Sequence, residues 1–202
     1  MKVHTCMEGI KLDETSQKII DATMTLIREK GYVAATTKDI AKAAGVNECT
    51  LFRKFRTKKD IVMRGLEQLK WRANISSEMF EPYVWNLQTD LEMMMNAYME
   101  RITPDFVSLS IGLRAPQIYD ETAPWIMKIP QTFVTMLSEY FKQMHERGKI
   151  TGRNYESMAM TVFSSTFGYT FLSASFQEQL TSILPETYVH DSVTLFIRGL
   201  NR

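Results

Sequence analysis

Apolar residues recur at spacings of three and four along most of the chain, which predicts a protein built of helices. Few segments alternate between apolar and polar positions as strands do, and glycine and proline fall mostly between the periodic runs. The first run predicts a helix from about Glu14 to Lys30, with Ile19 and Leu26 on its inner stripe and Gly31 ending it. We therefore expect an all-α fold.

Residues 36–55 predict two short helices separated by a tight turn. Thr36 is a natural N-cap for the first helix, and Asp39 follows three residues later, as in a capping box. Gly45 can adopt the positive φ that the end of a helix often requires. This pattern is typical of a helix-turn-helix motif.

The second of these helices has two distinct faces. Asn47 can cap it, and Leu51 and Phe55 lie one turn apart as a buried pair. The opposite face is polar and basic: it carries Glu48, Thr50, Phe52, Arg53 and Lys54. A short helix of this kind suits a recognition helix that enters a DNA major groove.

A cluster of positive charge follows directly, since five of the seven residues from Arg53 to Lys59 are Lys or Arg. Such cations can replace counterions on DNA phosphates, which gives affinity without sequence information. Lys58 and Lys59 also lie near the start of a helix, whose free N–H groups favour a phosphate. A basic run is often only a solvated surface, and the helix-turn-helix pattern upstream is what favours DNA here.

The predicted DNA contacts come from both helices and from the basic cluster. Side chains early in the second helix are expected to read bases, whereas the mouth of the first helix and the lysines are expected to bind phosphate. Cys49 fits as a small residue that permits close approach to DNA, with a redox switch as the alternative. The full set is Thr36, Thr37, Lys38, Asn47, Glu48, Cys49, Thr50, Phe52, Arg53, Lys54, Lys58 and Lys59.

The charge is unevenly distributed, although the net charge of the 202 residues is only +1. Residues 1–75 contain 15 Lys and Arg against 9 Asp and Glu, whereas residues 76–202 contain 9 against 14. Only the first part therefore suits contact with DNA. Two cysteines, Cys6 and Cys49, provide neither a disulfide framework nor a zinc cluster, which fits a cytoplasmic protein.

Other classes of protein receive little support from the sequence. It contains no phosphate loop, metal-ligand cluster or nucleophile elbow, and its three histidines lie far apart, so we expect no enzyme, metal or cofactor. Residues 157–177 carry no charge, but Ser, Thr and Gly make up much of this stretch, so we expect no membrane span.

The segment from about Glu14 to Leu69 resembles the N-terminal DNA-binding domain of TetR-family transcription regulators. The matching residues are Lys18 to Ala22, Gly31, Tyr32, Thr36, Ile40, Ala41, Ala44, Gly45, Val46, Thr50, Leu51, Phe52, Phe55 and Lys58 to Asp60. The chain departs from the family's pattern at Phe52, where a tyrosine is usual, and at Cys49, where glycine is common. An apolar contact with sugar or a thymine methyl is therefore expected of Phe52 in place of a phosphate hydrogen bond.

The resemblance implies an all-α protein with two domains. Residues 1–70 would form a three-helix DNA-binding domain, joined through a long helix to a ligand-binding and dimerisation bundle in residues 71–202. That long helix is expected to start near Lys58 and to continue past Trp71 towards Ile75. Further helices are expected over about 90–102, 104–119, 124–148, 155–176 and 187–200.

The resemblance also implies a homodimer. Small residues at helical spacing between Tyr155 and Phe176 would let another helix approach closely, and the last helix is its natural partner in a four-helix bundle about a twofold axis. The alternative is that these helices only fill the monomer's own core. The expected interface residues are Phe163, Ser164, Phe167, Gly168, Phe171, Leu172, Ser175, Val193, Phe196 and Ile197.

An effector pocket is the third implication. Methionines cluster on the helix at 90–102, and flexible thioethers suit a cavity that accepts several apolar shapes, although a methionine stripe is more often ordinary core. Glu92, Glu100 or Asp105, if turned inward, would favour a cationic ligand. The expected lining is Met94, Met95, Tyr98, Phe106, Leu109, Leu113, Trp125, Ile129, Phe133 and Phe167.

The sequence thus predicts a ligand-responsive, sequence-specific DNA-binding regulator. The family's habit implies a repressor that binds a palindromic operator as a dimer and is released by a small lipophilic or cationic effector. The alternative is a helix-turn-helix protein controlled by a protein partner. An enzyme is the remaining and least supported interpretation.

Overall fold

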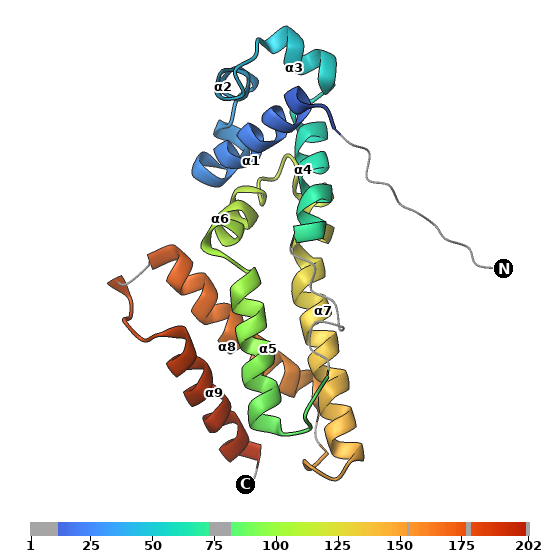
Figure 1. The fold of residues 1–202 in the computed structure, drawn as a ribbon, viewed down its shortest axis with the longest axis vertical. Coiled ribbons are helices and arrows are strands. Elements are labelled where there is room, and N and C mark those ends of the chain that lie inside the picture. The colour runs from blue at the N-terminus through green and yellow to red at the C-terminus, as the bar shows by residue number, and fades with distance from the viewer. Residues whose placement is uncertain (1–11, 73–81, 153, 177–178, 201–202) are drawn as a thin grey trace, which may run out of the picture.

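The computed structural model describes residues 12–72, 82–152, 154–176 and 179–200, and within these ranges the chain is helical, with no strand. Figure 1 shows an elongated molecule in which α1 to α4 form one end and α5, α7, α8 and α9 form the other. The helices are α1 (Glu14–Ala34), α2 (Thr37–Ala43), α3 (Glu48–Lys54), α4 (Lys58–Arg72), α5 (Leu87–Arg101), α6 (Pro104–Gly112), α7 (Tyr119–Glu146), α8 (Tyr155–Phe176) and α9 (Pro185–Leu200). The all-α prediction is confirmed.

Side-chain caps set the start of the helices at the N-terminal end. The Thr36 side chain accepts a hydrogen bond from the Asp39 N–H at the start of α2, as the sequence predicted. Gly45, at a φ of 68°, makes the turn between α2 and α3. The apolar faces of α1 to α4 then meet in one core, formed by Ile19, Ile20, Ile40, Ala41, Ala44, Leu51 and Ile61.

Gly31 predicted only part of how helix α1 ends. The backbone does break there, at a φ of 79°, but helical geometry resumes for one turn and ends at Ala34. The sequence predicted the break and missed the resumed turn. At the other end of the long helix α4, the described residues stop at Arg72, so the expected continuation to Ile75 lies outside them, as does Cys6.

Helices α5, α7, α8 and α9 enclose a second core. It is formed by methionine, aromatic and aliphatic side chains, several of which are fully buried: Leu91, Met94, Met95, Tyr98, Phe133, Leu137, Tyr140, Phe141 and Ala159. Asp90 is buried within it, where it accepts hydrogen bonds from the Tyr140 hydroxyl (2.8 Å) and from the Val84 N–H (2.9 Å). These bonds satisfy a carboxylate that would otherwise be costly to bury.

A third cluster joins the two ends of the molecule. It contains Ile27, Ala35, Val62, Leu66, Leu109, Leu113 and Ile118, which come from α1, α4, α6 and the segments beside them. Helix α6 lies very close to α1 at Gly112. A Cβ atom at this position would lie only 2.4 Å from the Ile27 carbonyl oxygen. A side chain at position 112 would therefore push α6 away from α1, and the contact between the two ends depends on glycine there.

The boundary between α6 and α7 differs from the prediction. Helix α6 ends at Gly112 instead of about residue 119, and α7 begins at Tyr119, so Pro124 lies inside α7 instead of opening it. The buried Thr122 hydroxyl donates to the Leu113 and Ile118 carbonyls (2.9 and 3.1 Å), which holds the first turn of α7 in place. These bonds tie the first turn of α7 to the segment that follows α6, at a helix start that the proline signal placed too late.

Smaller differences affect two other helices. Helix α5 begins at Leu87, three residues before the prediction, because Asn86 provides a side-chain cap. Helix α9 begins at Pro185. No described helix is both long and apolar enough to cross a membrane.

Candidate nucleic-acid interface

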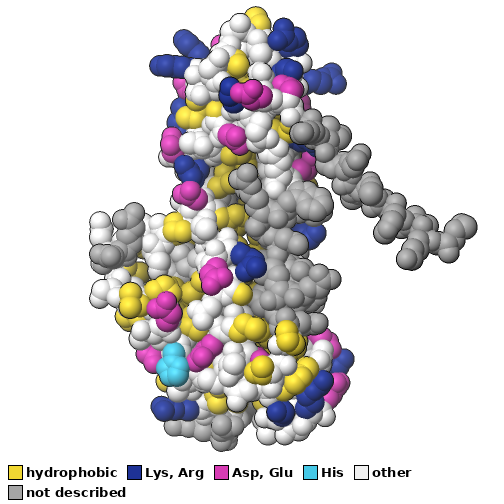
Figure 2. All heavy atoms as spheres, viewed as in Figure 1, with side chains coloured by type: hydrophobic (Ala, Val, Ile, Leu, Met, Phe, Trp, Pro, Cys, Tyr) yellow, Lys and Arg dark blue, Asp and Glu magenta, His cyan; other side chains and the backbone are white. Residues whose placement is uncertain are grey.

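Helices α2 and α3 lie at the tip of the molecule, away from α5 to α9 (Figure 1). Several Lys and Arg side chains project from this end (Figure 2). Helix α3 buries Leu51 completely and leaves Phe52 48 % exposed, so its two faces are separated as the sequence predicted. The outward face of α3 is therefore available to a large partner.

Two hydrogen bonds position the start of α3. The Asn47 side-chain oxygen accepts from the Thr50 N–H at 2.7 Å, which caps the helix. The Thr37 hydroxyl donates to the Glu48 carboxylate at 3.0 Å, which ties α3 to the first turn of α2. The side chains of Thr37, Asn47 and Glu48, all expected to contact DNA, thus also hold the motif together.

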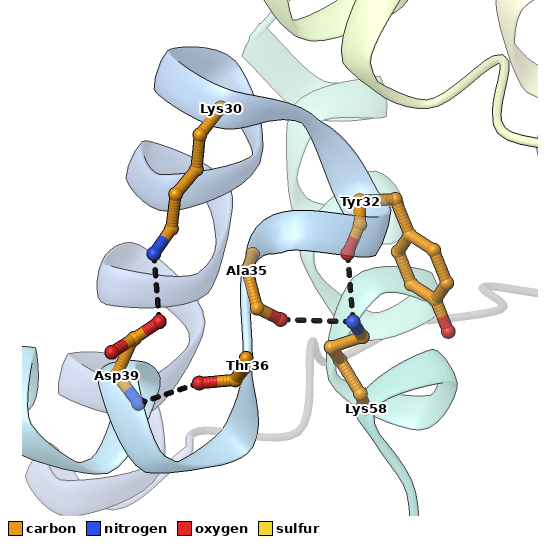
Figure 3. A network of polar contacts seen from close by, with 6 residues as sticks. All are labelled: Lys30, Tyr32, Ala35, Thr36, Asp39 and Lys58. Atoms are coloured by element: carbon orange, nitrogen blue, oxygen red, sulfur yellow. Dashed lines mark hydrogen bonds and ion pairs between the residues drawn. The ribbon is translucent and has the colours of Figure 1, made fainter.

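The Lys58 side chain already forms hydrogen bonds within the protein (Figure 3). Its ammonium donates to the carbonyls of Tyr32 and Ala35 at 2.7 and 2.8 Å and lies 4.1 Å from the centre of the Tyr32 ring. Partial burial lowers the pKa of Lys58 below its usual value. These bonds satisfy carbonyls at the end of α1, a role that the sequence did not predict. The phosphate contact expected of Lys58 remains a prediction.

Other lysines at this end are paired with carboxylates. Lys59 Nζ lies 2.6 Å from Glu121 Oε1 in the first turn of α7, and Lys54 Nζ lies 3.1 Å from Asp13 Oδ2 at the cap of α1. The hydrogen bond between Lys59 and Glu121 raises the pKa of the lysine and lowers that of the glutamate. A DNA phosphate would have to replace these carboxylates as the partner of each lysine.

The remaining candidates are open to solvent. Lys38, Cys49 and Arg53 are exposed, and none has a hydrogen bond or ion pair to another part of the described chain. Lys30, which lies beside this set, bonds Asp39 at 2.7 Å (Figure 3). The structure therefore brings all twelve predicted DNA contacts to one end, some free and some already bonded.

The predicted effector residues are divided between two clusters. Met94, Met95, Tyr98 and Phe133 are fully buried in the core of α5 to α9, with the Tyr98 and Phe133 rings 4.8 Å apart, and Phe106 and Ile129 pack against that core. Leu109, Leu113 and Trp125 belong instead to the cluster that joins the two ends. Phe167 stacks with Phe163 on α8, their ring centres 5.6 Å apart. The methionines are thus packed as core in this conformation.

The acidic candidates do not enter that core. The Glu92 carboxylate bonds His190 Nδ1 at 2.8 Å, between α5 and α9. Glu100 and Asp105 line a crevice between the two ends of the molecule, and Asp105 forms an ion pair with Arg28 of α1. This crevice holds two of the three charged groups that the sequence associated with a cationic ligand.

The predicted dimer residues lie on different sides of α8 and α9. Ser164, Leu172 and Ser175 face solvent, and a Cβ on Gly168 would meet no atom within 4 Å. Phe163, Phe171, Phe196 and Ile197 pack partly on the core, Phe167 stacks between Phe163 and Phe171, and Val193 is buried. Only part of the predicted set is therefore free to meet a second chain.

The most prominent residue of this face was absent from the predicted set. Leu195 on α9 is 68 % exposed and borders shallow grooves that also involve Thr161, Phe196 and Gly199. Helical spacing was the available signal, since Leu195 lies two residues from the buried Val193 and thus on another side of α9. The predicted set grouped the apolar residues of α9 without separating inner from outer positions.

These features define a helix-turn-helix protein with a separate helical bundle. Residues 19–64 match the family model of "Bacterial regulatory proteins, tetR family". A protein of Bacillus subtilis strain 168, described as the uncharacterized HTH-type transcriptional regulator YvkB, is 29 % identical over 187 residues, which cover 93 % of this chain and 97 % of that protein. Residues 19–64 thus match the DNA-binding segment of the TetR family, and the chain is similar over most of its length to a protein described as an HTH-type transcriptional regulator.

Solved structures share the whole fold. The fatty acid degradation regulator FadR from Bacillus halodurans has a TM-score of 0.65 at 22 % identity, over 95 % of this chain and 99 % of that one. FadR from Bacillus subtilis, solved in complex with stearoyl-CoA, has a TM-score of 0.68 at 18 % identity, over 91 % and 98 %. The similarity therefore extends well beyond the DNA-binding segment.

Proposed function

We propose that the protein is a dimeric, ligand-responsive repressor that binds a palindromic operator in the cytoplasm through α3. The observation that carries the proposal is the outward face of α3, whose Phe52 and Arg53 are exposed at the tip of the molecule. In a twofold dimer, two such helices would enter successive major grooves about 34 Å apart. We place the domain boundary near residue 70, within α4.

The dimer in this proposal forms through α8 and α9. Solvent-facing Ser164 and Leu172 on α8, the open side of Gly168 and the exposed Leu195 on α9 support it. Small residues let helices approach, and the two leucines supply apolar area. The exposed apolar side chains of this region include Leu172, Phe176, Leu180, Ile183, Leu184 and Leu195. Large apolar side chains exposed together favour burial against a partner.

The proposed effector is lipophilic, and long-chain acyl-CoA is the first candidate. FadR from Bacillus subtilis, whose fold this chain shares, is solved with stearoyl-CoA. Met94 and Met95 lie in the core of α5 to α9, and methionine side chains can repack around an inserted chain. Binding would favour a spacing of the two α3 helices that no longer fits the operator, which releases the DNA.

The experiment that tests this function is a gel shift with the DNA upstream of the protein's own gene. We expect a complex at nanomolar protein that stearoyl-CoA dissociates and free CoA leaves intact. Binding that stearoyl-CoA leaves unchanged would contradict the effector, and equal affinity for unrelated DNA would contradict the specific regulator.

Asn47→Asp tests the recognition helix in the same assay. Aspartate can still cap α3 through its side-chain oxygen, but it loses the amide donor that can face a base. We expect unchanged helicity and an altered base preference worth about 1–3 kcal/mol at one operator position. An unchanged preferred operator would remove Asn47 from the readout.

A further inference from the structure

A crevice of about 480 Å³ lies beside the contact between the DNA-binding end and the bundle of α5 to α9. Helices α1 and α4 form one wall, and the end of α5 with the start of α6 forms the other. Its volume lies within the range of roughly 300–1,000 Å³ that is usual for small-molecule sites. This crevice is distinct from the core that contains Met94 and Tyr98.

The floor and the rim of the crevice differ in chemistry. The floor is apolar and includes Ile20, Met24, Phe106 and Leu109. Met24 lies close to α4 there, since a Cβ on Gly65 would lie 2.7 Å from the Met24 sulfur. A ligand with an apolar body could therefore lie along this floor and keep its polar end at the rim.

The rim carries three carboxylates and two guanidinium groups, so its charge is negative by one. Asp21, Glu100 and Asp105 contribute negative charge, whereas Arg28 is already paired with Asp105. The Arg101 guanidinium donates back to the Ala97 carbonyl of its own helix at 3.2 Å. Glu100 is exposed and has no bonded partner among the described residues. The rim is thus suited to a cationic group.

We propose that this crevice binds an amphipathic organic cation, with its charged group between Glu100 and Asp105 and its apolar body on Met24, Phe106 and Leu109. Such a ligand would compete with Arg28 for Asp105 and so weaken an ion pair between α1 and α6. It would act at the junction of the two ends, as a site additional to the proposed lipophilic effector pocket.

Calorimetric titration of the full chain with decyltrimethylammonium, below its micelle concentration, tests the site without DNA. Decanoate and 1-decanol share the tail but carry a negative charge or none. We expect the cation to bind at least about fivefold more tightly than either, since each charged contact at an exposed site contributes about 0.2–1 kcal/mol. Equal affinity for decanoate or decanol would overturn the charge selection.

Two variants locate the site. Glu100→Gln should weaken binding of the cation about threefold by removing one charge, and Thr25→Trp should weaken it at least about tenfold by filling the crevice. Glu146→Gln and Glu29→Trp are the matched controls, because both glutamates are exposed and lie outside the lining. Wild-type affinity in Thr25→Trp would place the cation elsewhere and overturn the proposal.

The crevice and the proposed function can fail separately. Binding of the cation by a protein that does not shift operator DNA would leave the site standing and remove the regulator. Operator binding by a protein that gives no heat with the cation would support the regulator and overturn the crevice site.

Discussion

Single residues near the recognition helix differ in what already binds them. Lys58 donates two hydrogen bonds to the carbonyls of Tyr32 and Ala35, whereas Lys38 is exposed and unpaired within the described chain. A lysine in the first situation supports the fold, and one in the second is available to phosphate at once. Charge alone therefore does not rank these side chains as DNA contacts.

Lys58→Ala tests the structural role. We expect a loss of about 1 kcal/mol in the free energy of unfolding, because two carbonyls lose a charged donor at a partly exposed site. Urea denaturation measures this loss, and Lys38→Ala, on the exposed side of α2, should leave stability within about 0.5 kcal/mol of wild type.

The same variant also reports on DNA binding. If Lys58 keeps its carbonyl partners in the complex, the slope of log affinity against log salt will match wild type. If the ammonium moves to a phosphate, the slope will fall by about 1. Wild-type stability in Lys58→Ala would contradict the carbonyl role.

At the scale of helices, the DNA-binding end and the bundle are joined at more than one point. Helix α6 packs on α1 at Gly112, and Arg28 of α1 pairs with Asp105 of α6. Lys59 at the start of α4 pairs with Glu121 at the start of α7. A displacement of α7 would therefore change the partner of Lys59, and a displacement of α6 would change its contacts with α1.

Glu121→Gln should strengthen DNA binding. It removes the carboxylate that competes with phosphate for Lys59, and the gain should be about two- to fivefold at low salt, as expected for a surface ion pair. Fluorescence anisotropy with labelled operator measures the affinity. Asp120→Asn, the adjacent exposed acid, controls for the general loss of negative charge. An equal gain in both variants would show that the Lys59 pair has no particular role.

At the scale of the whole molecule, the surface of α8 and α9 bears on the proposed dimer. Phe163 and Val193 pack in the monomer's own core, so in the proposed dimer the second chain would meet the other sides of α8 and α9. Leu195 is the most exposed large apolar residue on those two helices. This separation decides which substitutions test the dimer without unfolding the protein.

Leu195→Asp should convert the proposed dimer to monomers at micromolar concentration, because a carboxylate would be buried against the partner without a counter-charge. Light scattering after size exclusion measures the mass. Val84→Asp is the matched control, since Val84 is 62 % exposed, close to the 68 % of Leu195, but lies outside α8 and α9. A persistent Leu195→Asp dimer would move the interface elsewhere.

The sequence by itself determined the features that local chemistry controls. The cap at Thr36, the turn at Gly45 and the cap at Asn47 each depend on residues within a few positions, so the pattern of the chain was enough to predict them. The all-α fold followed for the same reason, because helical periodicity is local. The cluster of candidate DNA contacts at one end followed from that motif.

Only the tertiary structure decided which residues far apart in the sequence contact one another and which of them are buried. The partner of Lys59 is Glu121, 62 positions away in the chain. The methionines of α5 became packed core, whereas Glu100 and Asp105 came to line a crevice against α1. Burial and ion pairing depend on which helices pack together. The sequence of a single helix does not specify the helix that it packs against.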